Sequence, residues 1–194
     1  IAGDVVHYGN DDPEADKYCR FVAESFADYV NSRVGMRGNH YAAGLYPVTM
    51  NVTFGKFTAA TPDGRRKGEP LSDGISAVQG YDVNGPTAIL GSVSNFDTSK
   101  YSNGLLLNMK FHPSAISDDA GVAKLASLMQ TYFFNMDGME MQLNIVSADT
   151  LRDAQKHPEN YKDLVVRIAG FSAYFTEVYK AAQDDLIRRT ELSL

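Results

Sequence analysis

Residues 164–175 of this 194-residue chain read Leu164-Val165-Val166-Arg167-Ile168-Ala169-Gly170-Phe171-Ser172-Ala173-Tyr174-Phe175. Apolar residues lead into a glycine, and aromatic residues follow it within a few positions. The apolar run predicts a short strand over residues 164–168, and the glycine predicts a turn at its end. Taken alone, Gly170 needs only a positive φ between two elements, which glycine adopts without steric cost.

Helices and strands alternate through the rest of the chain. Helical periodicity and capping residues predict helices over residues 12–34, 86–93, 118–136, 147–156 and 176–189. Alternating or β-branched runs predict strands over residues 46–54, 105–111 and 139–146. Asp12, Ser147 and Thr176 are the expected N-caps of three helices. This alternation indicates an α/β architecture with largely parallel pairing.

One long segment, residues 55–85, interrupts the pattern. Gly, Pro and Asp are dense between residues 55 and 74, so consecutive turns are expected there rather than a periodic element. A loop of this length inside a compact chain is usually functional or serves assembly.

Composition excludes several classes of partner. The net charge is −6 and no long basic run is present, so we expect no nucleic-acid partner. No apolar run approaches the roughly 18–20 residues that a membrane span needs. A single cysteine, Cys19, cannot form an internal disulfide or a cysteine-rich metal site, which fits a reducing cytoplasm. The first residue is Ile1 rather than Met, so we expect a fragment, a processed chain or a partial chain.

The common catalytic templates are absent from the sequence. There is no Gly-rich phosphate loop and no histidine pair at the spacing of a zinc site. Cys19 lies in the apolar stripe of the first predicted helix, so we expect a buried small residue rather than a nucleophile. The scattered histidines are expected to be surface or hydrogen-bonded residues: His7, His40, His112 and His157.

The segment Arg167-Ile168-Ala169-Gly170-Phe171-Ser172 resembles the glycyl radical motif, Arg-Val-any-Gly-Tyr, of glycyl radical enzymes. Ile168 replaces the valine with its shape kept, and Phe171 replaces the tyrosine with its ring kept. Further stretches resemble the same family in the expected order: residues 61–66, 69–76, 84–88, 92–94, 106–111, 142–146 and 153–158. The resemblance therefore covers nearly the whole chain.

The resemblance implies that Gly170 stores a radical. A radical at Cα is stabilised by delocalisation into the amide on each side, which requires a planar carbon that a side chain would hinder. It also requires shelter from oxygen, and the apolar residues around Gly170 suit a buried loop tip. In the family this radical passes to a cysteine on a facing loop. Cys19 does not lie in a matching cysteine-loop sequence, so the catalytic cysteine is expected outside this chain.

The family fold implies how the chain is organised. We expect the C-terminal portion of a ten-stranded α/β barrel, built of two antiparallel five-strand halves, with a buried glycyl radical loop. Residues 1–45 would be a helical segment leading into the barrel, and residues 46–163 would supply barrel strands and helices with the long loop. Residues 164–194 would form the radical loop and a C-terminal helix. Tyr46, Val48 and Met50 are candidate substrate-pocket residues, because the strand before the long loop lines the pocket in this family.

Residues 104–113 and 152–158 resemble the dehydratase and lyase branch, which implies elimination by breakage of a C–O, C–N or C–S bond in a small substrate. Arylacetate decarboxylation and arylsuccinate synthesis remain open. So do two non-catalytic roles: a subunit that replaces a damaged glycyl loop, and a radical-dead homologue retained for assembly, in which Gly170 is only a turn residue. The resemblance implies an S-adenosylmethionine-dependent activating enzyme that installs the radical, with no bound cofactor or metal. It also implies a homodimer in an oxygen-free cytoplasm, with a protein-shelled microcompartment as a further option.

Overall fold

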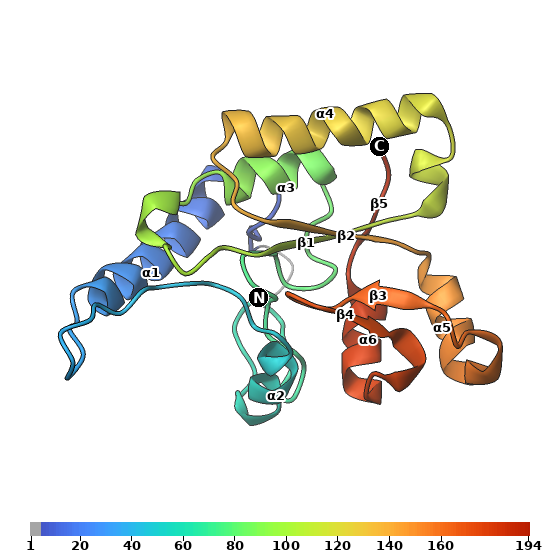
Figure 1. The fold of residues 1–194 in the computed structure, drawn as a ribbon, viewed down its shortest axis with the longest axis horizontal. Coiled ribbons are helices and arrows are strands. Elements are labelled where there is room, and N and C mark those ends of the chain that lie inside the picture. The colour runs from blue at the N-terminus through green and yellow to red at the C-terminus, as the bar shows by residue number, and fades with distance from the viewer. Residues whose placement is uncertain (1–4) are drawn as a thin grey trace.

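The computed structural model describes residues 5–194 and contains helices on both sides of a short parallel sheet (Figure 1). The helices are α1 (Pro13–Asn31), α2 (Met50–Phe57), α3 (Pro86–Val93), α4 (Asp119–Asn135), α5 (Ala148–Lys156) and α6 (Lys180–Arg188). The strands are β1 (Leu107–Phe111), β2 (Met141–Ile145), β3 (Val165–Arg167), β4 (Ser172–Tyr174) and β5 (Glu191–Leu192). The α/β class is confirmed.

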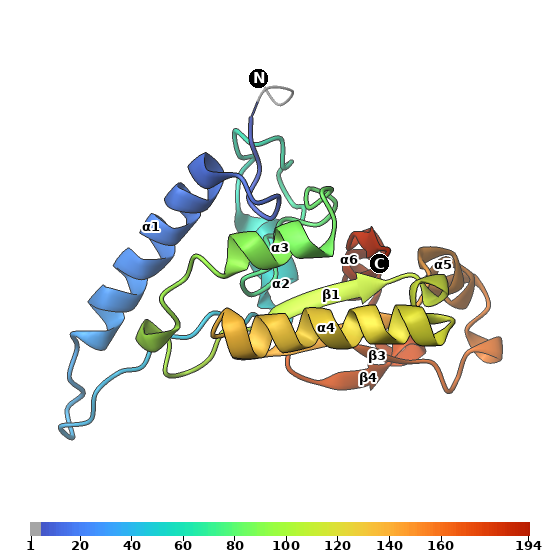
Figure 2. The ribbon, with the colours of Figure 1, turned by 90° about the horizontal axis from the view of Figure 1, so that it is seen from above.

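The central sheet has the order β2-β1-β5, and both of its pairings are parallel. All five residues of β1 are buried, as expected for the middle strand of a parallel sheet. Leu107, Met109 and Phe111 of β1 pack into the core with residues of α3 and α4, and α4 runs along the sheet (Figure 2). Asn108 and Lys110 alternate with them, so two polar side chains are buried on the opposite face.

A second, smaller sheet carries the segment with which the sequence analysis began. Strands β3 and β4 pair antiparallel, with Arg167 opposite Ser172, so residues 168–171 form the connection between them. Val166, Ile168 and Phe175 pack with α5 and α6 residues in a core separate from that of the central sheet. The tip of the hairpin is thereby anchored on one side.

Most predicted elements are confirmed. The helix over residues 86–93 is found with those bounds, and the helices α1, α4 and α5 and the strands β1, β2 and β3 lie within their predicted ranges. Strands β4 and β5 were not predicted, because three- and two-residue strands carry no periodic signal. The pairing is parallel in the central sheet but antiparallel in the hairpin. Among the described residues the strands form an open three-stranded sheet and a hairpin, not a closed barrel.

Two predicted elements are wrong. Residues 46–54 do not form a strand: Leu45 makes one isolated bridge to Leu105, Val48 has a φ of 58°, and α2 begins at Met50. A turn from the Met50 amide to the Pro47 carbonyl redirects the chain at that point. Thr176 does not cap the last helix, since it lies in a short 3-10 turn and α6 starts only at Lys180.

Of the described helices, none combines the length and apolar character that crossing a bilayer demands.

Candidate functional site

Gly170 is the third of the four residues, 168–171, that connect β3 and β4. Its φ is 93°, a conformation that side chains other than glycine rarely adopt. A Cβ built on Gly170 would meet only the Leu106 Cδ1 atom, at 3.9 Å. Backbone conformation, and not crowding, is therefore what requires glycine here in the described chain.

The amide of Gly170 is held by a side chain from β2. Its N–H donates to the Oε1 atom of Gln142 at 3.1 Å. Gln142 is only 3% exposed, and its Nε2 atom donates to Oε1 of Glu140 at 2.7 Å. Because Nε2 is held by Glu140, the Oε1 atom of the side-chain amide is the one that faces Gly170. The peptide plane before the Gly170 Cα is thus oriented by a neutral group.

Asn144, two residues along β2, holds the hairpin in a similar way. The Arg167 N–H donates to its Oδ1 atom, and its Nδ2 atom donates to the Arg167 carbonyl, both at 2.8 Å. The backbone groups of Leu164 and Ile168 bond to Phe175 and Phe171 on the other arm of the hairpin. Arg167, an odd number of residues from both, therefore directs its N–H and carbonyl the other way, toward β2. Asn144 therefore pairs with β3 as a backbone strand would.

Gly170 itself is exposed in this chain, although Ile168 and Ala169 before it are buried at 3% and 1%. Phe171 after it is 39% exposed. The described chain by itself does not bury the loop tip, and its burial within the larger enzyme stays a prediction. The hairpin buries the face toward β2 and α6, whereas the side-chain atom found near an added Gly170 Cβ is Leu106 Cδ1, at 3.9 Å.

A cavity of about 360 Å³ opens beside Gly170. Its lining includes Tyr46 and Val48, which the sequence analysis proposed as pocket residues, together with Leu106 and Phe171. Tyr46 is oriented by a 2.9 Å hydrogen bond from Asn103 Nδ2 to its hydroxyl. Met50, the third candidate, does not line this cavity, since it begins α2 and is 40% exposed. Whether the cavity holds substrate stays a prediction.

The remaining candidate groups lie apart from Gly170. Cys19 is partly buried on α1, and burial raises the pKa of its thiol to about 11, which disfavours a thiolate. It does not line the cavity beside Gly170. His112 caps a 3-10 turn, and His157 contacts Asp153 on α5. Across residues 5–194, no three His, Cys, Asp or Glu side chains are grouped as a metal site would require.

Sequence reasoning did not single out Gln142, Asn144 or Arg189 as site residues. The signal for the first two was present, because polar amides two residues apart in an otherwise apolar strand must share one face. That Gln142 bonds Gly170 and Asn144 bonds Arg167 depends on how the hairpin docks, which no local pattern encodes. Arg189, which donates to the Ile168 carbonyl, follows α6 as an ordinary basic residue, and nothing in its local sequence marked it.

Residues 71–176 match the family model described as "Glycine radical", and residues 1–55 match the one described as "Pyruvate formate lyase-like". The chain belongs to the glycyl radical enzyme family. Gly170 is the glycine of the motif within the matched range, and we call residues 167–171 the glycyl loop.

Curated relatives are named as dehydratases, sulfite-lyases and a decarboxylase. The chain is 44% identical to "Probable dehydratase YbiW" of Escherichia coli (strain K12) over 190 residues, which cover 95% of the chain and 24% of that protein. It is 43% identical to "(2S)-3-sulfopropanediol dehydratase" of Klebsiella oxytoca, with 97% of the chain and 23% of that protein covered. The chain thus spans about a quarter of the length of these relatives.

Solved structures agree in fold. The glycerol-bound form of the B12-independent glycerol dehydratase from Clostridium butyricum matches with a TM-score of 0.96 and 45% identity. The match covers 100% of this chain and 24% of that one. The α/β arrangement of the chain is therefore that of a portion of a larger glycyl radical enzyme.

Proposed function

We propose that this chain is the C-terminal part of a glycyl radical enzyme that stores a radical on Gly170 and eliminates a group from a small substrate. The observation that carries the proposal is the asymmetry of the glycyl loop. The backbone groups on one side of Gly170 are fixed by buried side chains, while the Cα lies open beside a cavity. A residue that must exchange a hydrogen atom with a partner needs such a geometry.

The reaction balances one hydrogen atom at each step. The S-adenosylmethionine-dependent activating enzyme removes a hydrogen atom from the Gly170 Cα. The glycyl radical then takes a hydrogen atom from a cysteine thiol outside this chain, and the resulting thiyl radical takes one from the substrate. The last two transfers are reversed after the leaving group departs: the product radical takes a hydrogen atom from the cysteine thiol, and the thiyl radical takes one from the Gly170 Cα, which restores the stored radical. The chain itself orients the Gly170 peptide through Gln142 and lines part of the cavity with Tyr46 and Val48.

The exposed apolar side chains of α1 indicate that another part of the enzyme covers this helix. This apolar face is between 49% and 69% exposed and comprises Tyr18, Phe21, Val22, Phe26 and Tyr29. Beside it lies an apolar groove of about 1050 Å³. A monomeric chain rarely leaves such a surface in water. We therefore assign its cover, and the cover of Gly170, to the portion that the relatives have beyond this chain's span. A homodimer in an anaerobic cytoplasm, or in a microcompartment, completes the proposal.

Decarboxylation is the second candidate. "Indoleacetate decarboxylase" of Tractidigestivibacter scatoligenes is 42% identical over 185 residues, close to the identities of the dehydratases. Sequence identity therefore does not separate the two reactions. Elimination is favoured because more of the relatives are named as dehydratases or sulfite-lyases, and an assay of both reaction types decides between them.

The test is electron paramagnetic resonance of the intact protein that contains this chain, after anaerobic incubation with a matching activating enzyme and S-adenosylmethionine. We expect a doublet from the remaining Gly170 Cα hydrogen, lost in Gly170→Ala. Gly68→Ala is the matched control, because Gly68 also has a positive φ, of 89°, and nothing within 4 Å of its added Cβ. A folded intact protein without a signal, or a signal that survives in Gly170→Ala, contradicts the proposal.

A further inference from the structure

The carbonyl of Ile168, two residues before Gly170, is held by an arginine from the end of α6. Arg189 Nη2 donates to this oxygen at 2.9 Å. The connection closes with one backbone hydrogen bond, from the Ile168 N–H to the Phe171 carbonyl at 2.9 Å. Within residues 5–194, Arg189 is the donor found for the Ile168 carbonyl. The orientation of this peptide group therefore depends on a side chain 21 residues away.

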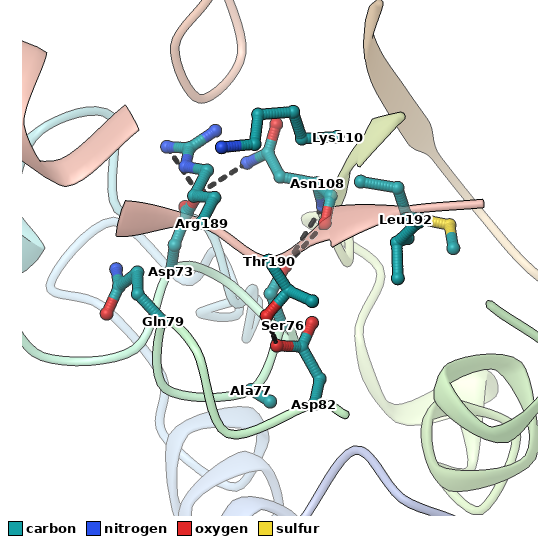
Figure 3. A pocket seen from close by; sticks show the side chains of 11 residues that line it. Asp73, Ser76, Ala77, Gln79, Asp82, Asn108, Lys110, Arg189, Thr190 and Leu192 are labelled. Carbon is teal, nitrogen blue, oxygen red and sulfur yellow. Dashed lines mark hydrogen bonds and ion pairs between the residues drawn. The ribbon is translucent and has the colours of Figure 1, made fainter. Parts of the chain in front are cut away.

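The same nitrogen of Arg189 meets two carboxylates. Nη2 lies 2.7 Å from Asp73 Oδ2 and 3.4 Å from Asp185 Oδ2. Asp73 belongs to the long loop, and Asn108 Nδ2 of β1 donates to its Oδ2 atom at 2.6 Å. Figure 3 shows the side chains of Arg189, Asp73 and Asn108 converging, joined by dashed lines. One guanidinium thus links the glycyl loop, the long loop and the central strand.

This cluster is buried rather than solvated. Asp73 is 2% exposed, Asp185 3%, Asn108 8% and Arg189 9%. Gln79 Nε2 fixes Asp185 further, through a 2.6 Å hydrogen bond to its Oδ1 atom. The position of the Asp73 segment is itself constrained, because the Ile75 N–H donates to the Leu106 carbonyl at 3.0 Å. The backbone at Gly74 approaches so closely that an added Cβ would lie 2.3 Å from the same oxygen. The Asp73 segment therefore cannot move away from Leu106 without breaking this hydrogen bond.

The cluster is not explained by stability. Burial raises the pKa of Asp73 to about 6 in spite of the Arg189 guanidinium, with Asp185 adding a further rise and Asn108 opposing it. Burial also raises the pKa of Asp185, while Lys110 and Asp82 lie nearby on the same side of the sheet. Desolvation of a buried ion pair can offset what the pairing returns, so such a cluster is weak evidence for stability. The contacts that the cluster makes to three segments of the chain point instead to what it positions.

We propose that Arg189 is a positioning residue for the glycyl loop, which it ties through the Ile168 carbonyl to the carboxylate of Asp73. The proposal rests on the proposed role of Gly170. The long loop is thereby part of the radical site without touching Gly170, because Asp73 sets where Arg189 lies and Arg189 sets where the Ile168 peptide lies. Displacement of residues 71–76 would be transmitted to the glycine along this path.

Hydrogen–deuterium exchange of the non-activated intact protein tests the link, with the radical yield measured in parallel. In Arg189→Gln we expect amides of residues 168–171 to exchange at least tenfold faster and the spin count per protein to fall severalfold. Arg189→Lys keeps one cationic nitrogen and should recover part of both losses. Arg188→Gln is the matched control. Arg188 is the last residue of α6 and directly precedes Arg189, but its Nη2 atom pairs at the surface with Glu69 Oε1, at 3.6 Å. We expect it to match the wild-type protein.

Asp73→Asn separates positioning from folding. It removes the buried charge but keeps the shape, so the unfolding temperature should not fall, whereas exchange in residues 168–171 should still accelerate. It also keeps the test decisive where Arg189→Gln does not fold. Exchange in the glycyl loop of Arg189→Gln or Asp73→Asn that stays within twofold of Arg188→Gln overturns the inference. If the wild-type protein gives no radical but the variants still differ from it in exchange, the proposed role of Gly170 is overturned and the link through Arg189 is supported.

Discussion

Replacement of Asn144 by leucine isolates how firmly the hairpin is held against β2. Leucine has nearly the same size and shape, so the change removes two hydrogen bonds to Arg167 without opening a large cavity. Each such bond contributes about 0.5–1.5 kcal/mol net. Arg167 is only partly buried, so water can partly satisfy its freed N–H and carbonyl. We therefore expect local opening of the hairpin to become easier by about 2 kcal/mol.

The assay is native-state hydrogen exchange of the intact protein, because opening of one segment is local and a global unfolding curve would average over it. A loss of about 2 kcal/mol corresponds to roughly 30-fold faster exchange in peptides that cover residues 164–175. Peptides that cover β1 serve as the internal reference. They should change little, because the Asn144 side chain bonds only the hairpin, and the substitution leaves its backbone pairing with Lys110 of β1 in place.

Asn144→Asp sharpens the test through pH. An aspartate at this position can still accept from the Arg167 N–H, but it places a carboxylate oxygen against the Arg167 carbonyl, where the amide donated at 2.8 Å. The loss should exceed that of leucine at neutral pH and shrink at acid pH, where a protonated carboxyl can donate again. Less than threefold faster exchange in Asn144→Leu, or equal acceleration in β1, would refute the reasoning.

Three further outcomes are expected. Gln142→Leu leaves the Gly170 N–H without its acceptor, so its exchange should rise about tenfold and the doublet should change in width, which isotope-labelled spectra would detect. Gly170→Ala and Gly68→Ala should each lower the free energy of unfolding by only about 1–2 kcal/mol, because a positive φ is penalised in both without a clash. A loss above about 4 kcal/mol in Gly170→Ala would contradict this. Burial raises the pKa of Asp73 from 3.8 to about 6, so the folded state holds an extra proton between these values. Stability should therefore fall by on the order of 2–3 kcal/mol as pH rises from 4 to 6.5, and Asp73→Asn should abolish this slope in urea unfolding.

Elements with a periodic pattern could be predicted from the sequence, whereas those set by distant contacts could not. The stripe in α4 and the proline start of α3 are local signals, and both helices lie where they were expected. Residues 46–54 are rich in β-branched and aromatic residues, yet α2 forms there. Gly55 packs so closely on the long loop that an added Cβ would lie 2.2 Å from the Glu69 carbonyl oxygen. A tertiary contact thus overrides local preference in that segment.

The candidate site shows the same division. Gly170 could be predicted because its motif is contiguous, and Tyr46 and Val48 lie in the same cavity although the reason given for them, a strand, was wrong. Met50 fails with that strand, since the helix that replaces it carries the side chain away from the cavity. Burial of Gly170 could not be judged from apolar neighbours alone, because the hairpin covers Ile168 and Ala169 and leaves the glycine open.

The side chains that bind the glycyl loop indicate which tasks of the site belong to this chain. Gln142, Asn144 and Arg189 each bind a main-chain group of residues 167–170, and none presents a reactive atom to the Gly170 Cα. Side-chain amides and a guanidinium are also poor hydrogen-atom donors, so they can hold a radical-bearing peptide without quenching it. If the chain's task is to hold and not to react, variants of these three residues should change how much radical forms and how long it lasts, with little effect on which substrate is used. Variants of the portion that covers Gly170 should change which substrate is used, with little effect on how much radical forms. A change of substrate caused by Arg189→Lys would contradict this assignment of roles.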